Sequence, residues 1–510
     1  MTNKLPYINP LLIAAAPVLF LWNHNFAEVF MWEVFPSLVV LLVFAVATFG
    51  VFWVLYRDPH KASFLASVTL VLALFYQYIF FNALIEGVMR HRWAFIIILL
   101  LIAALAYAVK RSQSAMVGAT KILTMVAGVF VLFSSLQLIG NYASASIQGR
   151  ISPQGSVVEA DVKEPRDIYY IIFDEYTAPE VFSEVLGFKG INDTVDFLEE
   201  QGFFVAKESR SNYSGTHLSL PSSLNLRYVD DYLEDGTKPL RVLTNMTLDN
   251  FLKDFLKARG YRYIHLGADW TDFWNPYADE NINIGFFSPF QMLLLRSTVF
   301  QPIGEALEGR SPLGVQLGIQ AEFLDYRRTQ WRRTQYQLEE LGKIPERNKG
   351  PVFVFAHLLL PHEPYVFDEE GNYVTKEGSD AKLQRENYLA QAAYTGAQIE
   401  ILVEKLLSRS KRAPIIILQG DHGHKFPLYE PERLQQEYGL KPDDMPDLMV
   451  RIFNAYYLPD GGDALLYGSI TPVNSFRVVL NYYFDQKLEL LEDKSYTFDP
   501  NDSAHFMLLP

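Results

Sequence analysis

Five long apolar runs in the first 140 residues constrain this chain more than any other feature. They lie at about Pro10–Trp22, Pro36–Tyr56, Ala62–Ile79, Trp93–Val109 and Met116–Ile139. Most hold 17 or more residues with almost no charge. As helices rising about 1.5 Å per residue, such runs can cross a hydrocarbon layer of about 30 Å. Helices of a soluble core would keep a polar face, so the sequence predicts five membrane-spanning helices.

Positively charged residues flank these runs unevenly. The loop between the third and fourth runs holds Arg90 and Arg92, whereas a larger group falls on the other side of the predicted membrane. The larger group is Lys4, Arg57, Lys61, Lys110 and Arg111. Because positive loops stay in the cytoplasm, the larger group is expected there. An odd number of spans then places the chain after about Asn141 outside the cytoplasm.

Charge divides the chain at the same point. Residues 1–145 hold eight Lys or Arg and four Asp or Glu, a net charge of +4, and the remainder holds 36 and 54, a net charge of −18. The acidic part is long enough for its own core, and its charge argues against a nucleic-acid partner. The stretch after Ala143 lacks a helical period and indicates a linker. We therefore predict a five-helix transmembrane domain at 1–142, a linker at 143–165 and a soluble domain at 166–510.

Strand and helix patterns alternate along the soluble domain. Helices are expected at Val181–Gln201, from a cap at Thr247 to Arg259, and at Leu383–Ser408. Apolar runs rich in β-branched and aromatic residues predict strands at 168–173, 203–206, 261–266, 352–356, 414–419 and 452–458. This alternation predicts an α/β domain with a mostly parallel central sheet covered by helices.

Acidic residues and histidines follow three of these strands. In such sheets, ligands bind at the carboxyl ends of the strands. Oxygen and imidazole ligands at rigid strand ends suit a divalent cation, so the joint pattern favours a metal site. Single residues have simpler explanations, such as a helix cap for Asp174, a turn for Asp421-His422-Gly423 and a core histidine for His357. The candidates are Asp174, Glu175, His357, His362, Asp421, His422 and His424.

A hydroxyl nucleophile is suggested by the segment Ser211–Asn225, in which Gly215 precedes Thr216. Backbone N–H groups at a helix start stabilise developing negative charge, and a metal lowers the pKa of a hydroxyl that it binds. Serine- and threonine-rich turns are common, so this segment alone is weak evidence. The chain has no cysteine, which excludes disulfides, cysteine-ligated metals and a cysteine nucleophile.

These elements, in this order, resemble the alkaline phosphatase and sulfatase superfamily. The elements are the acidic strand end, the Gly-Thr turn, the Pro-His-x-Pro loop at 361–364 and the Asp-His-Gly turn at 421–423, and they cover about residues 166–460. With its five predicted spans, the chain most resembles the membrane-anchored branch, the lipoteichoic acid synthases and lipid A phosphoethanolamine transferases. The resemblance implies one site for zinc or manganese, with a second metal conceivable near His362.

The resemblance also implies a role for each matched residue. Thr216 is expected to carry the phosphoryl group, with His362 or His424 as general acid or base. Substrate binding is assigned to His357, His362 and Asn212. The expected metal ligands are Asp174, Glu175, Thr216, Asp421 and His422. True sulfatases use Cys or Ser in C/S-x-P-x-R. Ser219-Leu220-Pro221 lacks the required arginine, so formylglycine chemistry is not expected.

The predicted function is transfer of a phospholipid-derived headgroup, of the phosphoglycerol or phosphoethanolamine type, to a glycan or lipid acceptor of the cell envelope. The resemblance implies a multi-pass protein of a bacterial-type plasma membrane with its catalytic domain outside the cytoplasm. One alternative is a membrane-anchored phosphodiesterase or phosphatase that uses the same phosphothreonine. A lesser alternative is a non-catalytic binding protein of the envelope.

Two further segments have open interpretations. The apolar segment Phe286–Phe300 is either core of the soluble domain or an interfacial element that rests on the bilayer or on the spans. The segment Asp325–Gln335 places four arginines on an expected helix. These arginines are either a solvated face or contacts to lipid phosphates.

Overall fold

The computed structural model describes residues 5–85, 89–112, 116–146, 165–229, 240–268, 272–285, 287–300, 302–303, 326–375, 381–426, 432, 435, 438–499 and 502–509. The chain divides into two compact units. The membrane unit comprises Met1–Gln148 and Gly285–Tyr326, and the α/β unit comprises Gly149–Ile284 and Arg327–Pro510. Residues 147–164, most of the predicted linker, lie outside the described residues.

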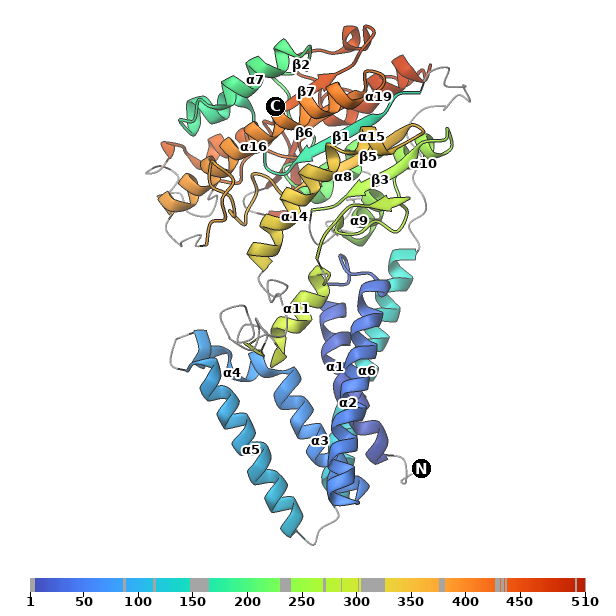
Figure 1. Ribbon diagram of the computed structural model, residues 1–510, viewed down its shortest axis with the longest axis vertical. Coiled ribbons are helices and arrows are strands. Elements are labelled where there is room, and N and C mark those ends of the chain that lie inside the picture. Colours follow the sequence, from blue (N-terminus) through green and yellow to red (C-terminus); the bar gives the residue numbers. More distant parts are fainter. Residues whose placement is uncertain are drawn as a thin grey trace. The chain divides into compact units, whose positions relative to one another are not determined.

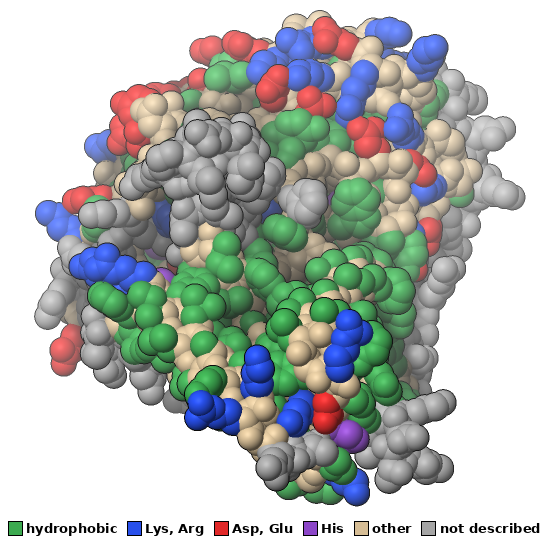
Figure 2. All heavy atoms as spheres, turned by 60° about the horizontal axis from the view of Figure 1, so that its bottom comes forward, with side chains coloured by type: hydrophobic (Ala, Val, Ile, Leu, Met, Phe, Trp, Pro, Cys, Tyr) green, Lys and Arg blue, Asp and Glu red, His purple; other side chains and the backbone are tan. Residues whose placement is uncertain are grey.

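Apolar helices build the membrane unit (Figure 1). They are α1 Leu5–His24, α2 Met31–Tyr56, α3 Pro59–Leu74, α4 Tyr76–Ile85, α5 His91–Arg111 and α6 Val117–Ser146. Large apolar side chains such as Val40, Leu55, Leu99 and Phe133 are each more than 60% exposed, as expected for side chains that face lipid. Figure 2 shows hydrophobic side chains spread over these helices, with Lys and Arg gathered at their near end.

Four of these helices, α1, α2, α5 and α6, are long and apolar enough to cross a membrane. The predicted third span at 62–79 is instead divided at Phe75 into α3, with 16 residues, and α4. A distant segment takes part in this break, because the backbone N–H of Val299 donates to the carbonyl of Ala73 at 2.7 Å. The third of the five predicted spans is therefore a shorter apolar helix than the other four.

The apolar segment near residue 290 belongs to the membrane unit. Helix α11, Pro289–Ser297, starts with a reciprocal cap in which Ser288 Oγ accepts from the N–H of Gln291 and Gln291 Oε1 accepts from the N–H of Ser288. Phe290 and Leu294 are buried in one apolar cluster with residues of α1, α2 and α3. Of the two interpretations of this segment, packing on the spans is confirmed, and packing in the core of the soluble domain is wrong.

A seven-stranded sheet forms the centre of the α/β unit, in the order β2-β7-β6-β1-β5-β3-β4. Strands β6, β1, β5, β3 and β4 run parallel, and β7 is antiparallel to both β6 and β2. The predicted mostly parallel sheet is thus confirmed. Its strands are β1 Ile168–Phe173, β2 Phe204–Val205, β3 Arg262–Leu266, β4 Glu280–Asn281, β5 Val352–Leu358, β6 Ile415–Gly420 and β7 Asn454–Tyr457. A separate hairpin pairs β8 Tyr496–Asp499 with β9 Asp502–Leu508.

Helices cover both faces of this sheet because its strands are apolar on both sides (Figure 1). On one face, Tyr169, Ile171 and Phe173 of β1 pack with α7 Ile191–Glu200, α14 Tyr326–Leu341, α15 Ile344–Arg347 and α16 Ala381–Arg409. On the other face, Tyr170 and Ile172 pack with α8 Thr216–Asn225, α10 Phe251–Lys257 and α19 Pro472–Tyr483. The remaining elements are α9 Leu240–Leu248, α18 Met445–Leu448, the π-helical turn Val181–Val185 and the 3₁₀ turns Pro442–Asp444 and Gly462–Leu465.

Two helix boundaries differ from the predictions. The helix expected over 181–201 is divided between the π-helical turn and α7. The expected cap Thr247 lies inside α9. Asn250 caps α10 instead, because its side chain accepts from the N–H of Lys253 at 2.8 Å.

Two of the four arginines near residue 330 donate hydrogen bonds to backbone carbonyl groups. Arg333 is 3% exposed and donates to the carbonyl of Ala268 at 3.2 Å and to that of Ile284 at 3.3 Å. Arg327 donates to the carbonyls of Tyr365 and Val374. Both interpretations offered for this arginine run are therefore wrong for these two residues.

Candidate active site

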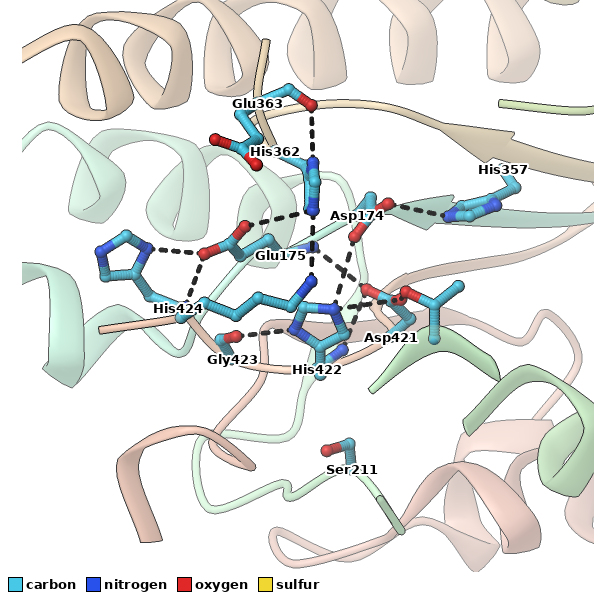
Figure 3. Close-up of polar contacts among 12 residues, drawn as sticks. Asp174, Glu175, Ser211, His357, His362, Glu363, Asp421, His422, Gly423 and His424 are labelled. Carbon is cyan, nitrogen blue, oxygen red and sulfur yellow. Dashed lines mark hydrogen bonds and ion pairs between the residues drawn. The ribbon is translucent and has the colours of Figure 1, made fainter. Parts of the chain in front are cut away.

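The sheet register brings two candidate carboxylates together. β1 lies between β5 and β6, and Phe173 at the end of β1 pairs with Gly420 at the end of β6. Asp174 and Asp421 are the next residues, so they leave the sheet side by side. Both are buried, and Figure 3 shows them beside the ring of His422.

His422 adds a third acceptor to these two carboxylates. Its Nδ1 lies 2.8 Å from the carbonyl oxygen of Gly423. A carbonyl only accepts, so Nδ1 donates, and Nε2 is the ring atom available to a metal ion. This Nε2 lies 3.6 Å from Asp174 Oδ1 and 3.7 Å from Asp421 Oδ2. We call Asp174, Asp421 and His422 the Asp–His cluster.

The Asp–His cluster has the geometry and chemistry of a divalent cation site. One ligand atom from each of its residues lies within 4.8 Å of the others. Within the described part of the chain, Asp174 Oδ1 and His422 Nε2 are buried without a hydrogen-bond partner. Converging carboxylates and a lone pair are costly to bury unless a cation lies between them. Carboxylate oxygen and imidazole nitrogen are ligands that suit zinc and manganese, so the residues present fit such an ion.

Thr216 lies at this cluster, at the first position of α8. Gly215 before it is extended, with φ −163°. The Thr216 hydroxyl donates to Asp421 Oδ2 at 2.6 Å. Asp421 is fixed in turn, because its Oδ1 accepts from the N–H groups of Glu175 at 3.1 Å and His422 at 2.9 Å. The hydroxyl thus contacts the Asp–His cluster and lies at the positive end of a helix dipole.

The other candidates form a second group around Glu175. Glu175 Oε1 lies 2.9 Å from His424 Nδ1 and accepts from the N–H of Lys425 at 2.5 Å. Glu175 Oε2 lies 3.7 Å from His362 Nε2. The backbone of Glu175 has φ 63°, a conformation that non-glycine residues rarely adopt and that concentrates at functional sites. We call Glu175, His362, His424 and Lys425 the Glu175 cluster.

The partners of Glu175 keep it ionised. Burial raises the pKa of this carboxyl, but the hydrogen bond from His424 and the charge of His362 outweigh burial and lower the pKa to about 2. His424 is itself held, since its ring stacks on Tyr388 with centroids 4.1 Å apart. The Tyr388 hydroxyl donates to the carbonyl of Glu175 at 2.9 Å. Glu175, expected as a metal ligand, therefore has its carboxylate engaged outside the Asp–His cluster.

Lys425 is the residue of this site that the sequence reasoning missed. Its Nζ lies 3.3 Å from His362 Nε2. Burial lowers the pKa of Lys425, but Glu175, Asp174 and Asp421 together raise it above the ordinary value, so the ammonium stays charged. Lys425 could have been predicted from its position, because it directly follows Asp421-His422-Gly423-His424 in the sequence.

His362 is the most open histidine of the site. Its side chain is 18% exposed, against 6% or less for His357, His422 and His424. Nδ1 of His362 donates to the carbonyl of Glu363 at 2.6 Å, so Nε2 is the ring atom turned toward Glu175 (Figure 3). The same Nε2 contacts Lys425 Nζ. The open side of the site therefore presents an imidazole beside an ammonium.

His357 and Asn212, both assigned to substrate binding, are placed differently. His357 lies inside β5, paired with Ile172, because the strand runs two residues further than predicted. It is buried, and Figure 3 shows it to one side of Asp174, away from the ring of His422. Asn212 is also buried, and its amide donates to the carbonyl of Lys494 and accepts from the N–H of Val473. None of these partners of Asn212 belongs to either cluster.

Comparison with known families agrees with this arrangement. The family model described as sulfatase matches residues 170–452, more than half of the chain, and contains every residue of both clusters. The chain belongs to the sulfatase family. The superfamily resemblance inferred from the motifs is confirmed, and with it the combination of N-terminal membrane helices and a sulfatase-like α/β domain.

Several solved structures resemble this sulfatase-family chain in fold. The C-terminal periplasmic domain of EcEptC from Escherichia coli, in complex with Zn, is 11% identical with a TM-score of 0.44 and covers 70% of this chain and 96% of its own. The integral membrane lipooligosaccharide phosphoethanolamine transferase A (EptA) from Neisseria meningitidis is 13% identical with a TM-score of 0.41 and covers 92% and 94%. The lipoteichoic acid synthase LtaP from Listeria monocytogenes is 12% identical with a TM-score of 0.40 and covers 65% and 76%. No curated protein sequence matches this chain.

Proposed function

We propose that this sulfatase-family chain is a metal-dependent enzyme that transfers a phospho-headgroup from a phospholipid to an acceptor of the cell envelope, with Thr216 as nucleophile. One observation carries the proposal: the Thr216 hydroxyl, at the start of a helix, donates at 2.6 Å to a carboxylate of a buried cluster that fits a divalent cation. A hydroxyl poised between a helix start and metal ligands is the arrangement that phosphoryl transfer requires.

Asp174, Asp421 and His422 would hold the metal, zinc or manganese. When bound, the ion supplies positive charge that lowers the pKa of the hydroxyl and offsets the charge of the phosphoryl oxygens. Asp421 orients the Thr216 hydroxyl, because Oδ2 accepts its hydrogen and Oδ1 is held by two backbone N–H groups. Little movement of Asp421 is therefore needed before the reaction.

The proposed reaction has two transfers. In the first, Thr216 Oγ1 loses its proton and forms a bond to phosphorus, while the bond from phosphorus to the diacylglycerol oxygen breaks and that oxygen takes a proton. In the second, an acceptor hydroxyl loses its proton and forms a bond to phosphorus, while the bond from phosphorus to Thr216 Oγ1 breaks and Oγ1 takes a proton. We assign the proton transfers to His362 because it is the most open histidine, while His424 holds Glu175.

Lys425 is proposed to bind a non-reacting phosphoryl oxygen. Lys425→Met is expected to lower kcat/KM by about 100-fold, because a positive charge that offsets phosphoryl charge is lost. Lys425→Arg should recover part of the loss. The measurements are initial rates on lipid donor and metal affinity by calorimetry, with the exposed residue Lys487→Met as the matched control. A Lys425→Met variant as active as the Lys487→Met variant would contradict this role.

The membrane unit agrees with a lipid-linked donor. We propose that residues 166–510 form the catalytic domain, that the segment around α11 is its insertion into the membrane unit, and that the domain faces the outside of a bacterial-type plasma membrane. The odd number of crossings required by this placement includes α3, which at about 24 Å is short for a bilayer but within the range that local thinning accommodates.

An acceptor-omission assay tests the proposed function. The full-length chain is reconstituted in vesicles that contain labelled phosphatidylethanolamine and phosphatidylglycerol, with and without envelope glycolipid. A transferase forms diacylglycerol substantially only with acceptor, and the lipid consumed identifies the headgroup. Release of free headgroup without acceptor would replace the transferase by a hydrolase. No consumption of either lipid in the presence of metal and acceptor would contradict a phospholipid donor of these two types.

A further inference from the structure

A buried histidine lies between two carboxylates on the far side of Asp174 from the ring of His422. His357 Nδ1 lies 2.8 Å from Asp272 Oδ2, and His357 Nε2 lies 3.4 Å from Asp174 Oδ2. The three residues are each at most 4% exposed. The other oxygen of Asp174, Oδ1, is the atom that lies 3.6 Å from His422 Nε2. His357 Nε2 thus faces one oxygen of Asp174 within ion-pair distance, and the other oxygen faces the Asp–His cluster.

The position of Asp272 is enforced by its surroundings. A Cβ on Gly267 would come within 1.7 Å of the carbonyl oxygen of Asp272, so only glycine permits this approach. That same carbonyl accepts from His265 Nε2 at 2.6 Å. The chain at Gly267 is fixed from the other side, because Gln337 of α14 donates to its carbonyl at 2.8 Å. Neither Asp272 nor Gln337 has a part in the chemistry described above.

We propose that Asp272 is a positioning residue for the metal site, acting through His357 to orient Asp174. The proposal rests on the proposed function, in that Asp174 is taken as a metal ligand. The Asp272 carboxylate fixes the tilt of the His357 ring, and the ring in turn keeps Asp174 from rotating its Oδ1 away from His422. A carboxylate that must otherwise be ordered when the ion binds would bind it more weakly, because the cost of ordering is subtracted from the affinity.

The test measures zinc affinity of the full-length protein, with the melting temperature of the metal-free protein as a second readout. Asp272→Asn keeps the size of the side chain and removes its charge, and we expect the dissociation constant for zinc to rise about 10-fold to 100-fold. The matched control is Asp279→Asn, which removes an acid of the same stretch whose partners are Lys257 and the N–H of Tyr263. This control should change the melting temperature at most and leave zinc affinity unaltered.

A double-mutant cycle separates a relay from two independent structural effects. His357→Gln should weaken zinc binding by a similar factor, and the double variant should lose little more, because both changes break one connection. Additive losses, or an Asp272→Asn variant with unchanged zinc affinity, would overturn the inference and leave the proposed function standing. A wild-type chain that binds neither zinc nor manganese would overturn both.

Discussion

Replacing Thr216 by alanine is expected to abolish headgroup transfer, with a fall in kcat of about 10,000-fold or more, because the hydroxyl proposed to form the covalent intermediate is removed. The position of the Thr216 hydroxyl supports this expectation. The hydroxyl lies 2.6 Å from Asp421 Oδ2 at the first position of α8, so the change removes the reacting atom from the site. Thr216→Ser keeps the hydroxyl and should retain a measurable fraction of the activity.

Mass spectrometry of the chain after incubation with membrane lipids provides the direct measurement. A phospho-headgroup adduct should appear on the peptide that contains Thr216 and be absent from Thr216→Ala. Its mass identifies the transferred group. The control is Ser222→Ala on the same helix, whose hydroxyl donates to the carbonyl of Arg227, away from both clusters. An active Thr216→Ala variant, or an adduct on a different residue, would show that the nucleophile has been assigned wrongly.

Removing the metal is expected to have an effect of comparable size. Dialysis against a chelator should lower the rate by about 1,000-fold or more, because several kcal/mol of charge stabilisation are lost in the transition state. The melting temperature should fall as well, since an ion that binds only the folded state stabilises it. Zinc or manganese should restore both quantities, and the more effective ion at equal occupancy identifies the metal that suits the site.

The variant Asp421→Asn distinguishes an effect of the metal site from an unspecific loss of activity. This variant should stay inactive at any metal concentration, because Asp421 contacts both the proposed ion site and Thr216. The exposed residue Asp463→Asn should behave as the wild-type chain does, including restoration by metal. Full activity after exhaustive chelation, with no ion detected in the protein, would contradict the proposed role of the Asp–His cluster.

The Asp–His cluster could be predicted from the sequence because parallel strands end at the same edge of a sheet. Strands β1 and β6 are continuous apolar runs, and the residues after neighbouring parallel strands must meet at one edge. This rule selected Asp174, Asp421 and His422 among other candidates, and the family resemblance assigned them as metal ligands. Thr216 was a weaker prediction, since a Ser- and Thr-rich segment does not reveal which hydroxyl will start a helix beside the sheet.

The rest of the site depends on packing between distant segments. Lys425 is an exposed lysine, and only the approach of Glu175 and His362 from distant segments makes it part of the site. Asp272 reaches His357 only because Gly267 allows the chain to pass so closely. Arg333 is buried because backbone carbonyls at Ala268 and Ile284 surround it, whereas its own helix pattern suggested a solvated face. No local pattern in the sequence encodes such long-range partners.

The return of the chain to the membrane unit at Gly285 has a consequence for how this protein can be released. Its polypeptide passes between the two units three times, at 148–149, 284–285 and 326–327. A protease that cuts between residues 147 and 164 would therefore not release the α/β unit, because that unit would stay connected through α11, which packs in the apolar cluster around Phe290 and Leu294. A single cleavage there would leave both pieces attached to the membrane unit.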